Sequence, residues 1–269
     1  MGILPALFLG AVQGVAEFWP ISSSAHLALM IYLFGWGDPD LSFLVALHLG
    51  TLVAVVWHYR HRLRDIFLAC LKEATGKERG GEDARLGWMM LLATVPGLIL
   101  GAVFAESSEI MEGMPLLMAS TLAVFGLALW CADVLGGEEL TWREAGWRQA
   151  LAVGVAQALA IMPGVSRSGA SISVARAAGL GRREAADFSF LLSVPITAAA
   201  VAYEGLKLLR EGMPGGAAWP MVCGACSAAL TGYLAIRFLL SRLAGGTFKP
   251  YAVYRLFLAA VLVITLVVL

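Results

Sequence analysis

Charged side chains are scarce in this 269-residue chain: 14% of its residues are charged, against about 25% in an ordinary soluble domain. Neither sign is in excess, since 19 Lys and Arg balance 19 Asp and Glu. A nucleic-acid-binding protein would show a basic excess, and a disordered chain would combine low hydrophobicity with high net charge. With 59% hydrophobic residues, the chain also has too few charges to coat a soluble core. The composition therefore indicates a polytopic membrane protein.

Cysteine is scarce as well, and the four cysteines lie in or beside apolar stretches: Cys70, Cys131, Cys223 and Cys226. The last two have the spacing of a redox pair, but no βαβ pattern surrounds them. We interpret them as small packing residues of an apolar helix, and no disulfide framework is indicated.

Six apolar runs are long enough to cross a bilayer as helices, which requires about 20 residues each. They cover roughly residues 41–59, 86–105, 116–135, 185–206, 218–241 and 252–269. The sequence therefore predicts an all-α polytopic membrane protein with six transmembrane helices.

Two further apolar regions, 3–34 and 148–178, are interrupted at their centres by proline and polar residues. The interruptions are Trp19-Pro-Ile-Ser-Ser-Ser24 and Pro163-Gly-Val-Ser-Arg-Ser-Gly169. A proline breaks helix continuity, and lipid cannot satisfy the freed backbone groups, so each break must face protein or a water-filled cavity. We predict that both regions are re-entrant helix–loop–helix elements.

The charges of the loops predict the orientation of the chain by the positive-inside rule. Segment 60–85 is rich in Lys and Arg and is predicted to be cytoplasmic, whereas segments 35–40 and 106–115 carry only acidic charges and are predicted to be external. Region 3–34 must then begin and end outside, and region 148–178 must begin and end inside. The charges used are Arg60, Arg62, Arg64, Lys72, Lys77, Arg79 and Arg85 inside, and Asp38, Asp40, Glu106, Glu109 and Glu112 outside.

The two halves of the chain resemble each other. The segment that begins at Gln13 (QGVAEFWPISSS) is similar to the one that begins 144 residues later at Gln157 (QALAIMPGVSRS). Each half holds one re-entrant element and three spans, and because three is odd, the second half is predicted to sit upside down relative to the first. We expect one integral membrane domain, 1–269, with inverted repeats of about 1–135 and 148–269.

Polar residues gather around the first break. Gln13 and Glu17 are four residues apart and share one helical face, and three serines and His26 follow the break. A carboxylate inside a membrane is costly and usually marks a functional site, although a protonated, hydrogen-bonded Glu17 is the structural alternative. Glu17 would ligate Mg²⁺ or Ca²⁺, with Gln13 as a weaker oxygen ligand, and such an ion can bridge to phosphate.

The second break contains Arg167, the only Lys or Arg between Arg148 and Arg176. Its planar fork stays ionised and suits phosphate oxygens, the neighbouring glycines let the backbone approach an anion, and a following helix N-terminus would add its dipole. The pattern predicts a phosphate-binding loop. The alternative, an ion pair of Arg167 with Glu17, is compatible with function because substrate could replace Glu17.

This inventory of one acid, one histidine, several hydroxyls and one arginine suits phosphoryl transfer, in which positioning and charge stabilisation do most of the work. His48 lies within the first long span. The sequence leaves open whether it is a partner of the polar site or a core histidine bonded to a helix carbonyl.

The two polar segments resemble the signatures of a known family. Gln13-x-x-x-Glu17 with Pro20-Ile-Ser-Ser-Ser-Ala-His26 is similar to the first signature of bacterial undecaprenyl pyrophosphate phosphatases, the bacitracin-resistance proteins, and Pro163 to Ser171 is similar to the second. The segments 184–195 and 249–255 are also family-like, so the resemblance covers essentially the whole chain. Family members have Glu or Gln at the position of Gln13, and usually Thr at that of Ser171.

The resemblance implies a bacterial plasma-membrane enzyme that hydrolyses undecaprenyl pyrophosphate to undecaprenyl phosphate and inorganic phosphate. Such an enzyme recycles the lipid carrier for peptidoglycan synthesis and gives bacitracin resistance. The resemblance also implies a homodimer whose active site is open to the external, periplasmic face.

Carried over position by position, the resemblance also implies roles for the site residues. Arg167 would hold the pyrophosphate, and Glu17, with Gln13, would bind the metal or act as acid or base. Ser23 is the preferred nucleophile, and His26 would transfer a proton to or from Ser23 or the leaving group. The residues expected to bind the phosphates are Ser22, Ser24, Gly164, Ser166, Ser168 and Ser171.

Two other function classes fit part of the pattern. A transporter or flippase would share inverted repeats with broken helices, but it would release no phosphate in detergent, where no gradient exists. An intramembrane serine protease would use Ser and His in one membrane site, but it would not need Arg167.

Overall fold

The computed structural model describes residues 1–37, 39–77, 80–137, 140–211 and 218–268. Within these ranges the regular secondary structure is helical, apart from one isolated bridge between Leu140 and Leu180. The elements, in chain order, are α1 (Ile3–Phe18), α2 (Ser23–Phe34), α3 (Leu41–His58), α4 (Arg60–Ala74), α5 (Glu82–Glu112), α6 (Pro115–Leu135), α7 (Trp147–Ala158), the 3₁₀ turn η1 (Leu159–Ile161), α8 (Arg167–Ala177), α9 (Arg182–Glu211), α10 (Ala218–Leu243) and α11 (Lys249–Val268).

Six helical segments in the described part of the chain are long and apolar enough to cross a membrane. They are Leu41–His58, Glu82–Phe104, Pro115–Leu135, Arg182–Leu208, Ala218–Leu243 and Lys249–Leu266. These segments coincide with the six predicted apolar runs, so the multi-span, all-α architecture is confirmed.

One predicted loop is largely helical in the structure. The segment 106–115 was expected to be an external loop, but α5 continues through Glu112 beyond the non-helical backbone of Phe104. Because no glycine or proline occurs between Phe104 and Gly113, nothing in the local sequence ends the helix earlier.

The predicted cytoplasmic segment 60–85 also contains a helix, α4, which packs against α5 through the buried Ile66. A Cβ at Gly87 would lie 2.3 Å from Cys70 Sγ, so the two helices are in close contact. Two of the charges on which the orientation was predicted, Asp38 and Arg79, lie outside the described residues.

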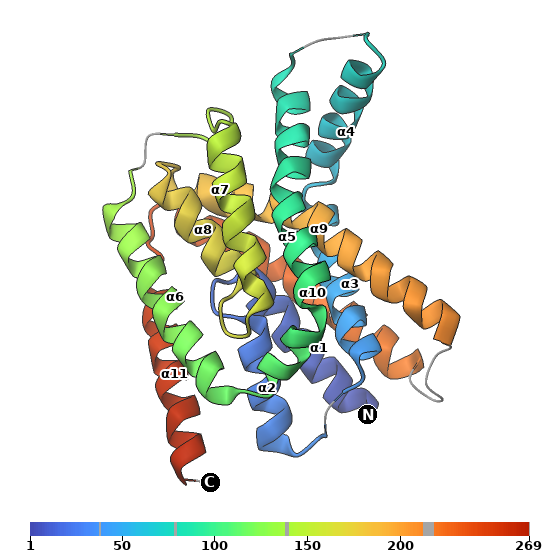
Figure 1. The fold of residues 1–269 in the computed structure, drawn as a ribbon, viewed down its shortest axis with the longest axis vertical. Coiled ribbons are helices and arrows are strands. Elements are labelled where there is room, and N and C mark those ends of the chain that lie inside the picture. Colours follow the sequence, from blue (N-terminus) through green and yellow to red (C-terminus); the bar gives the residue numbers. More distant parts are fainter. Residues whose placement is uncertain (38, 78–79, 138–139, 212–217, 269) are drawn as a thin grey trace.

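Both interrupted regions form two helices joined by a break. The first break separates α1 from α2 and contains Pro20, and the second separates η1 from α8 and contains Pro163. Each proline lies between helices, where its missing N–H removes no helical hydrogen bond. In Figure 1, α1 begins at the end of the molecule where both termini lie, α7 begins towards the opposite end, where α4 and α5 are joined, and the breaks lie between these ends.

Two glycines, Gly10 and Gly154, allow close crossings of the broken helices with long ones. A Cβ at Gly10 of α1 would lie 2.3 Å from the Gly224 oxygen of α10, and a Cβ at Gly154 of α7 would lie 2.5 Å from the Ala93 oxygen of α5. Small residues let helix backbones approach each other in membranes. Each crossing joins a broken helix to a long helix from the other half of the chain.

Helix α11 lies along α6 at the edge of the molecule in Figure 1. It packs with α6 and α2 in one buried cluster that includes Ala25, Leu122 and Leu258. This packing places the residues near the start of α11 beside both helix breaks.

Candidate active site

The two breaks are joined directly by hydrogen bonds. The Gly164 amide donates to Ser24 Oγ at 3.3 Å, and Ser168 Oγ donates to the Trp19 carbonyl at 3.2 Å. Polar segments that lie far apart in the sequence therefore form one site.

The carboxylate of Glu17 is the centre of this site, and it is 9% exposed. Its Oε2 accepts hydrogen bonds from Ser23 Oγ at 2.9 Å and from Gln13 Nε2 at 3.2 Å. Its Oε1 accepts from Arg167 Nη2 at 3.1 Å and from Arg167 Nε at 3.3 Å. The structure thus brings together Gln13, Glu17, Ser23 and Arg167, from α1, α2 and α8.

Two features of this arrangement suit phosphoryl transfer. Ser23 donates its hydroxyl hydrogen to a carboxylate, which is the relation between a nucleophile and its general base. Arg167 Nη1 is buried and has no hydrogen-bond partner among the described residues, so a donor remains for an anion beside Glu17.

His26 is held by two other groups. Its Nδ1 lies 2.6 Å from the Ser22 carbonyl and its Nε2 lies 2.7 Å from the Tyr254 hydroxyl, against whose ring it also stacks. Because a carbonyl can only accept, Nδ1 carries a hydrogen. Both ring nitrogens of His26 therefore bond groups other than Ser23, and its role in proton transfer stays a prediction.

The N-caps of α2 and α8 share a rare backbone conformation. Ser22 has φ 73° and ψ 102°, and Ser166 has φ 67° and ψ 111°; they are the only non-glycine residues with positive φ in the described part of the chain. Each lies within 3.3 Å, hydroxyl to hydroxyl, of the serine two positions later, Ser24 or Ser168. A non-glycine residue in such a region costs about 1–3 kcal/mol and persists only where its surroundings hold it.

Three hydroxyls of the second break bond protein groups. Ser166 Oγ caps α8 by accepting from the Gly169 amide, Ser168 Oγ donates to Trp19, and Ser171 Oγ donates to the Arg167 carbonyl. Gly164 has φ 86° and contacts α6 so closely that a Cβ would lie 2.2 Å from Thr121 Oγ1 and 2.4 Å from the Met118 carbonyl oxygen. The predicted phosphate contacts of these residues stay predictions.

His48, whose role the sequence left open, faces the site. Its Nδ1 lies 2.9 Å from the Leu44 carbonyl, so Nδ1 carries a hydrogen and Nε2 points away from the helix carbonyl. Nε2 lies 3.9 Å from Glu17 Oε2. His48 is bonded to its own helix and is also a neighbour of Glu17, but its side chain is 41% exposed, so it is not a core residue.

Two further residues of the site, Tyr254 and Arg255, were not predicted as site residues. Tyr254 bonds His26, and the buried Arg255 donates to carbonyls of both breaks. The only sequence indication of them was the family-like segment 249–255, because nothing in the local pattern shows that an arginine of the last helix reaches residues more than 200 positions earlier.

The donor set around Glu17 suits a hard cation. Among the described residues, no group of three or more His, Cys, Asp or Glu side chains could hold a metal. Gln13 Oε1, however, is buried without a hydrogen-bond partner one helical turn from Glu17. One carboxylate and one amide oxygen fit Mg²⁺ or Ca²⁺, which take oxygen ligands and share them with waters and substrate phosphates.

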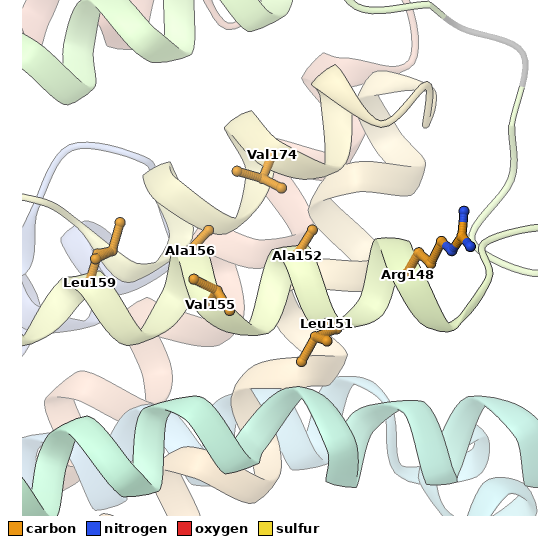
Figure 2. A pocket seen from close by; sticks show the side chains of 7 residues that line it. All are labelled: Arg148, Leu151, Ala152, Val155, Ala156, Leu159 and Val174. Atoms are coloured by element: carbon orange, nitrogen blue, oxygen red, sulfur yellow. The ribbon is translucent and has the colours of Figure 1, made fainter.

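A groove of about 560 Å³ lies along α7 (Figure 2). Apart from Arg148 at one end, its lining is apolar, and none of the predicted site residues lines it. Its lining residues are Arg148, Leu151, Ala152, Val155, Ala156, Leu159 and Val174. The groove therefore does not contain the polar site.

A family model and several curated relatives each match nearly the whole chain. A family model described as Bacitracin resistance protein BacA matches residues 6–261. A protein of Moorella thermoacetica named undecaprenyl-diphosphatase is 43% identical over 263 residues, which are 98% of this chain and 97% of the relative. Proteins of the same name from Pelotomaculum thermopropionicum (42% over 256 residues, 95% and 94%) and Saccharophagus degradans (42% over 265 residues, 97% of both) are similar too.

Proposed function

The chain belongs to the Bacitracin resistance protein BacA family, and from this premise we propose how its site works and how it sits in the membrane. It is a multi-span membrane phosphatase that hydrolyses undecaprenyl pyrophosphate to undecaprenyl phosphate and inorganic phosphate. The product is the lipid carrier that peptidoglycan synthesis reuses, and bacitracin resistance is associated with the family.

The observation that carries the mechanism is the double use of the Glu17 carboxylate. One oxygen bonds Arg167 and the other bonds Ser23, so anion binding and nucleophile activation meet at one residue. We infer that the terminal phosphate replaces Glu17 as the partner of Arg167. The unpartnered Nη1 then supplies an additional hydrogen bond to the phosphate.

In the first chemical step, Ser23 Oγ attacks the terminal phosphorus while Glu17 Oε2 accepts the hydroxyl proton. A bond forms between Oγ and phosphorus, and the bond from phosphorus to the bridging oxygen breaks. Undecaprenyl phosphate leaves with the bonding electron pair.

In the second step, water attacks the phosphoserine. Glu17 returns its proton to Ser23 Oγ as the bond from phosphorus to Oγ breaks, and the protons of the water stay on the inorganic phosphate. Arg167 offsets the charge on the phosphate oxygens in both steps.

His26, in its imidazolium form with a hydrogen on both ring nitrogens, is the proposed donor of a proton to the leaving oxygen, and it regains that proton from water after the reaction. The Tyr254 hydroxyl that holds its Nε2 must be displaced by that oxygen or relay the proton to it. A serine-protease reading receives no support from this geometry, because the Ser23 hydroxyl bonds a carboxylate and not His26.

Gln13 Oε1 and an oxygen of Glu17 are the proposed ligands of a divalent cation, Mg²⁺ or Ca²⁺. When bound, such an ion would neutralise charge on the phosphate oxygens next to Arg167.

We also propose that the halves of the chain are inverted repeats with two re-entrant elements. Three pairs of features, each 144 residues apart, support this: the crossings at Gly10 and Gly154, the positive φ at Ser22 and Ser166, and the serine–serine contacts that follow them. The opposite directions from which α1 and α7 approach the centre (Figure 1) support it too.

By the positive-inside rule, the basic α4 and the start of α5 face the cytoplasm. Both termini lie at the opposite end of the molecule (Figure 1), and α1 and α2 open toward that end. We therefore propose a bacterial plasma-membrane protein whose site opens to the external, periplasmic face. We further propose a homodimer, on the resemblance alone, which light scattering of the purified protein in detergent would test.

Phosphate release from undecaprenyl pyrophosphate by the purified protein in detergent tests the mechanism. We expect turnover by the unaltered protein and by Arg148→Ala, whose arginine lines the α7 groove, and no turnover by Arg167→Ala. A transporter without phosphatase activity would release no phosphate in any sample, and equal turnover in Arg167→Ala would overturn the mechanism.

A further inference from the structure

Arg255 of α11 is fully buried, with 0% of its surface exposed, and its guanidinium is bound entirely by carbonyl groups. Nη2 donates to the carbonyls of Gly164 and Val165, each at 2.9 Å, and Nη1 donates to the carbonyl of Pro20 at 3.3 Å. Nε donates to the Leu122 carbonyl of α6 at 3.2 Å. A single side chain therefore binds both helix breaks and anchors them to α6.

The bound carbonyls lie next to the two strained N-caps. Pro20 is two residues before Ser22, and Gly164 and Val165 come directly before Ser166. Both serines have positive φ, a conformation that the surroundings must hold in place. Because Arg255 fixes the peptide groups just before each serine, it fixes the directions in which α2 and α8 begin.

Those two helix starts carry the chemistry. Ser23 is the first residue of α2 and Arg167 is the first residue of α8, and both bond Glu17. A shift of either break would therefore move Ser23 or the Arg167 guanidinium away from the Glu17 carboxylate. The contacts of Arg255 are also close on the side of α8, where a Cβ at Gly169 would lie 2.8 Å from Nη1.

We propose that Arg255 is the positioning residue of this site, which holds the two breaks in the register that makes Ser23 and Arg167 converge on Glu17. Its planar fork is essential to this role, because several donors in one plane reach carbonyls of both breaks at once, which a lysine ammonium cannot do. This inference rests on the proposed phosphatase mechanism.

Arg176 offers a matched control. It is also 0% exposed, and its guanidinium also donates to carbonyls, among them those of Gly136 at 2.9 Å and Asp133 at 3.3 Å. These groups lie at the C-terminal end of α6 and away from the breaks. Substitution of Arg176 therefore reports the general cost of removing a buried, carbonyl-bound arginine.

The experiment compares Arg255→Lys and Arg255→Met with Arg176→Lys and Arg176→Met in detergent. We measure the thermal midpoint, kcat and KM for phosphate release, and hydrogen–deuterium exchange of segments 19–24 and 162–168. We expect both pairs to lower the midpoint. We expect only the Arg255 variants to lose kcat. The loss should be about 100-fold, which is what a displacement of about 1 Å at an active site causes. We also expect faster hydrogen–deuterium exchange in both segments of the Arg255 variants.

Three outcomes would overturn the proposal. The first is a folded Arg255→Met variant whose kcat is unaltered. The second is a loss of kcat in the Arg176 variants as large as that in Arg255 variants of the same thermal midpoint, and the third is unaltered hydrogen–deuterium exchange in both breaks of Arg255→Lys. If Arg255→Met does not fold, the two lysine variants carry the comparison. If the unaltered protein releases no phosphate, the proposed function is overturned. The positioning role of Arg255 is then still decided by hydrogen–deuterium exchange, because that measurement does not depend on turnover.

Discussion

Arg167 and Glu17, which are 150 residues apart in the chain, form an ion pair that joins the two helix breaks, with Nη2 3.1 Å from Oε1. The two side chains are 14% and 9% exposed. Each comes from a helix that ends or begins at a break, so this contact joins the two polar segments into one site. It also makes the two residues mutually dependent, because removing either one leaves a largely buried charge without its partner.

Arg167→Ala and Glu17→Ala are each expected to abolish phosphatase activity. The first removes the guanidinium proposed to bind the phosphate, and the second removes both the proposed general base and the carboxylate that orients Arg167. Arg167→Lys should restore little activity, since an ammonium lacks the paired donors. Phosphate release by the purified variants checks this, with elution as a single folded species as the control; normal turnover in either alanine variant would contradict the mechanism.

Ser23→Ala is expected to lose activity by about 10³-fold or more, whereas Ser168→Ala, which removes at most a contact to the phosphates, should lose much less. The difference follows from the partners, because Ser23 Oγ donates to the Glu17 carboxylate and Ser168 Oγ donates to the Trp19 carbonyl. Turnover of the two variants distinguishes them. A large loss in Ser168→Ala alone would show that another hydroxyl is the nucleophile, and high activity in both variants would indicate direct attack by water.

Tyr254→Phe is expected to lower kcat by about tenfold without unfolding the protein. The substitution removes the hydroxyl 2.7 Å from His26 Nε2 but keeps the stacked ring, so the histidine loses one of its two hydrogen bonds and keeps the one to the Ser22 carbonyl. The pH dependence of kcat should change as well, since that hydroxyl bonds a titrating nitrogen. An unaltered kcat and pH profile would show that the His26–Tyr254 contact has no part in the reaction.

Gly14→Ala is expected to destabilise the protein by about 1–3 kcal/mol, the usual cost of overpacking. A Cβ at Gly14 would lie 2.0 Å from Thr231 Oγ1 and 2.6 Å from the Ala228 oxygen of α10. Because Gly14 lies between Gln13 and Glu17, activity should fall too. Gly205→Ala is the control, since a Cβ there meets nothing within 4 Å. A lower thermal midpoint is expected only for Gly14→Ala, and equal midpoints would refute the close crossing.

A chelator is expected to reduce phosphate release, and excess Mg²⁺ or Ca²⁺ should restore it. The proposed ligands are oxygens of Glu17 and Gln13, so Gln13→Ala should raise the metal concentration needed for half-maximal activity. Gln157→Ala is the matched control in the second half, because Gln157 Nε2 bonds the Ala93 carbonyl of α5 and lies outside this donor set. Activity that is indifferent to chelator would remove the cation from the mechanism.

The sequence correctly predicted the features that depend on local composition. The six apolar segments follow from the length needed to cross a bilayer, and the breaks follow from Pro20 and Pro163 together with the polar residues that accompany them. Proline alone does not end a helix here, since Pro96 lies within α5 and Pro195 within α9. Segment 106–115 was wrongly predicted as a loop, because its acidic charge resembled a loop while its residues still form helix up to Glu112.

The sequence by itself thus determined the membrane class, the six spans and the two charged residues, Glu17 and Arg167, that lie at the breaks. Only the tertiary structure decided the partners: Ser23 on Glu17, Tyr254 on His26, and Arg255 across both breaks. Whether a segment can cross the bilayer or is interrupted depends on the composition of that segment alone, so both features can be predicted from the local sequence. Hydrogen bonds between elements up to 235 residues apart depend on helix crossings set by side-chain packing, which spacing along one chain does not specify.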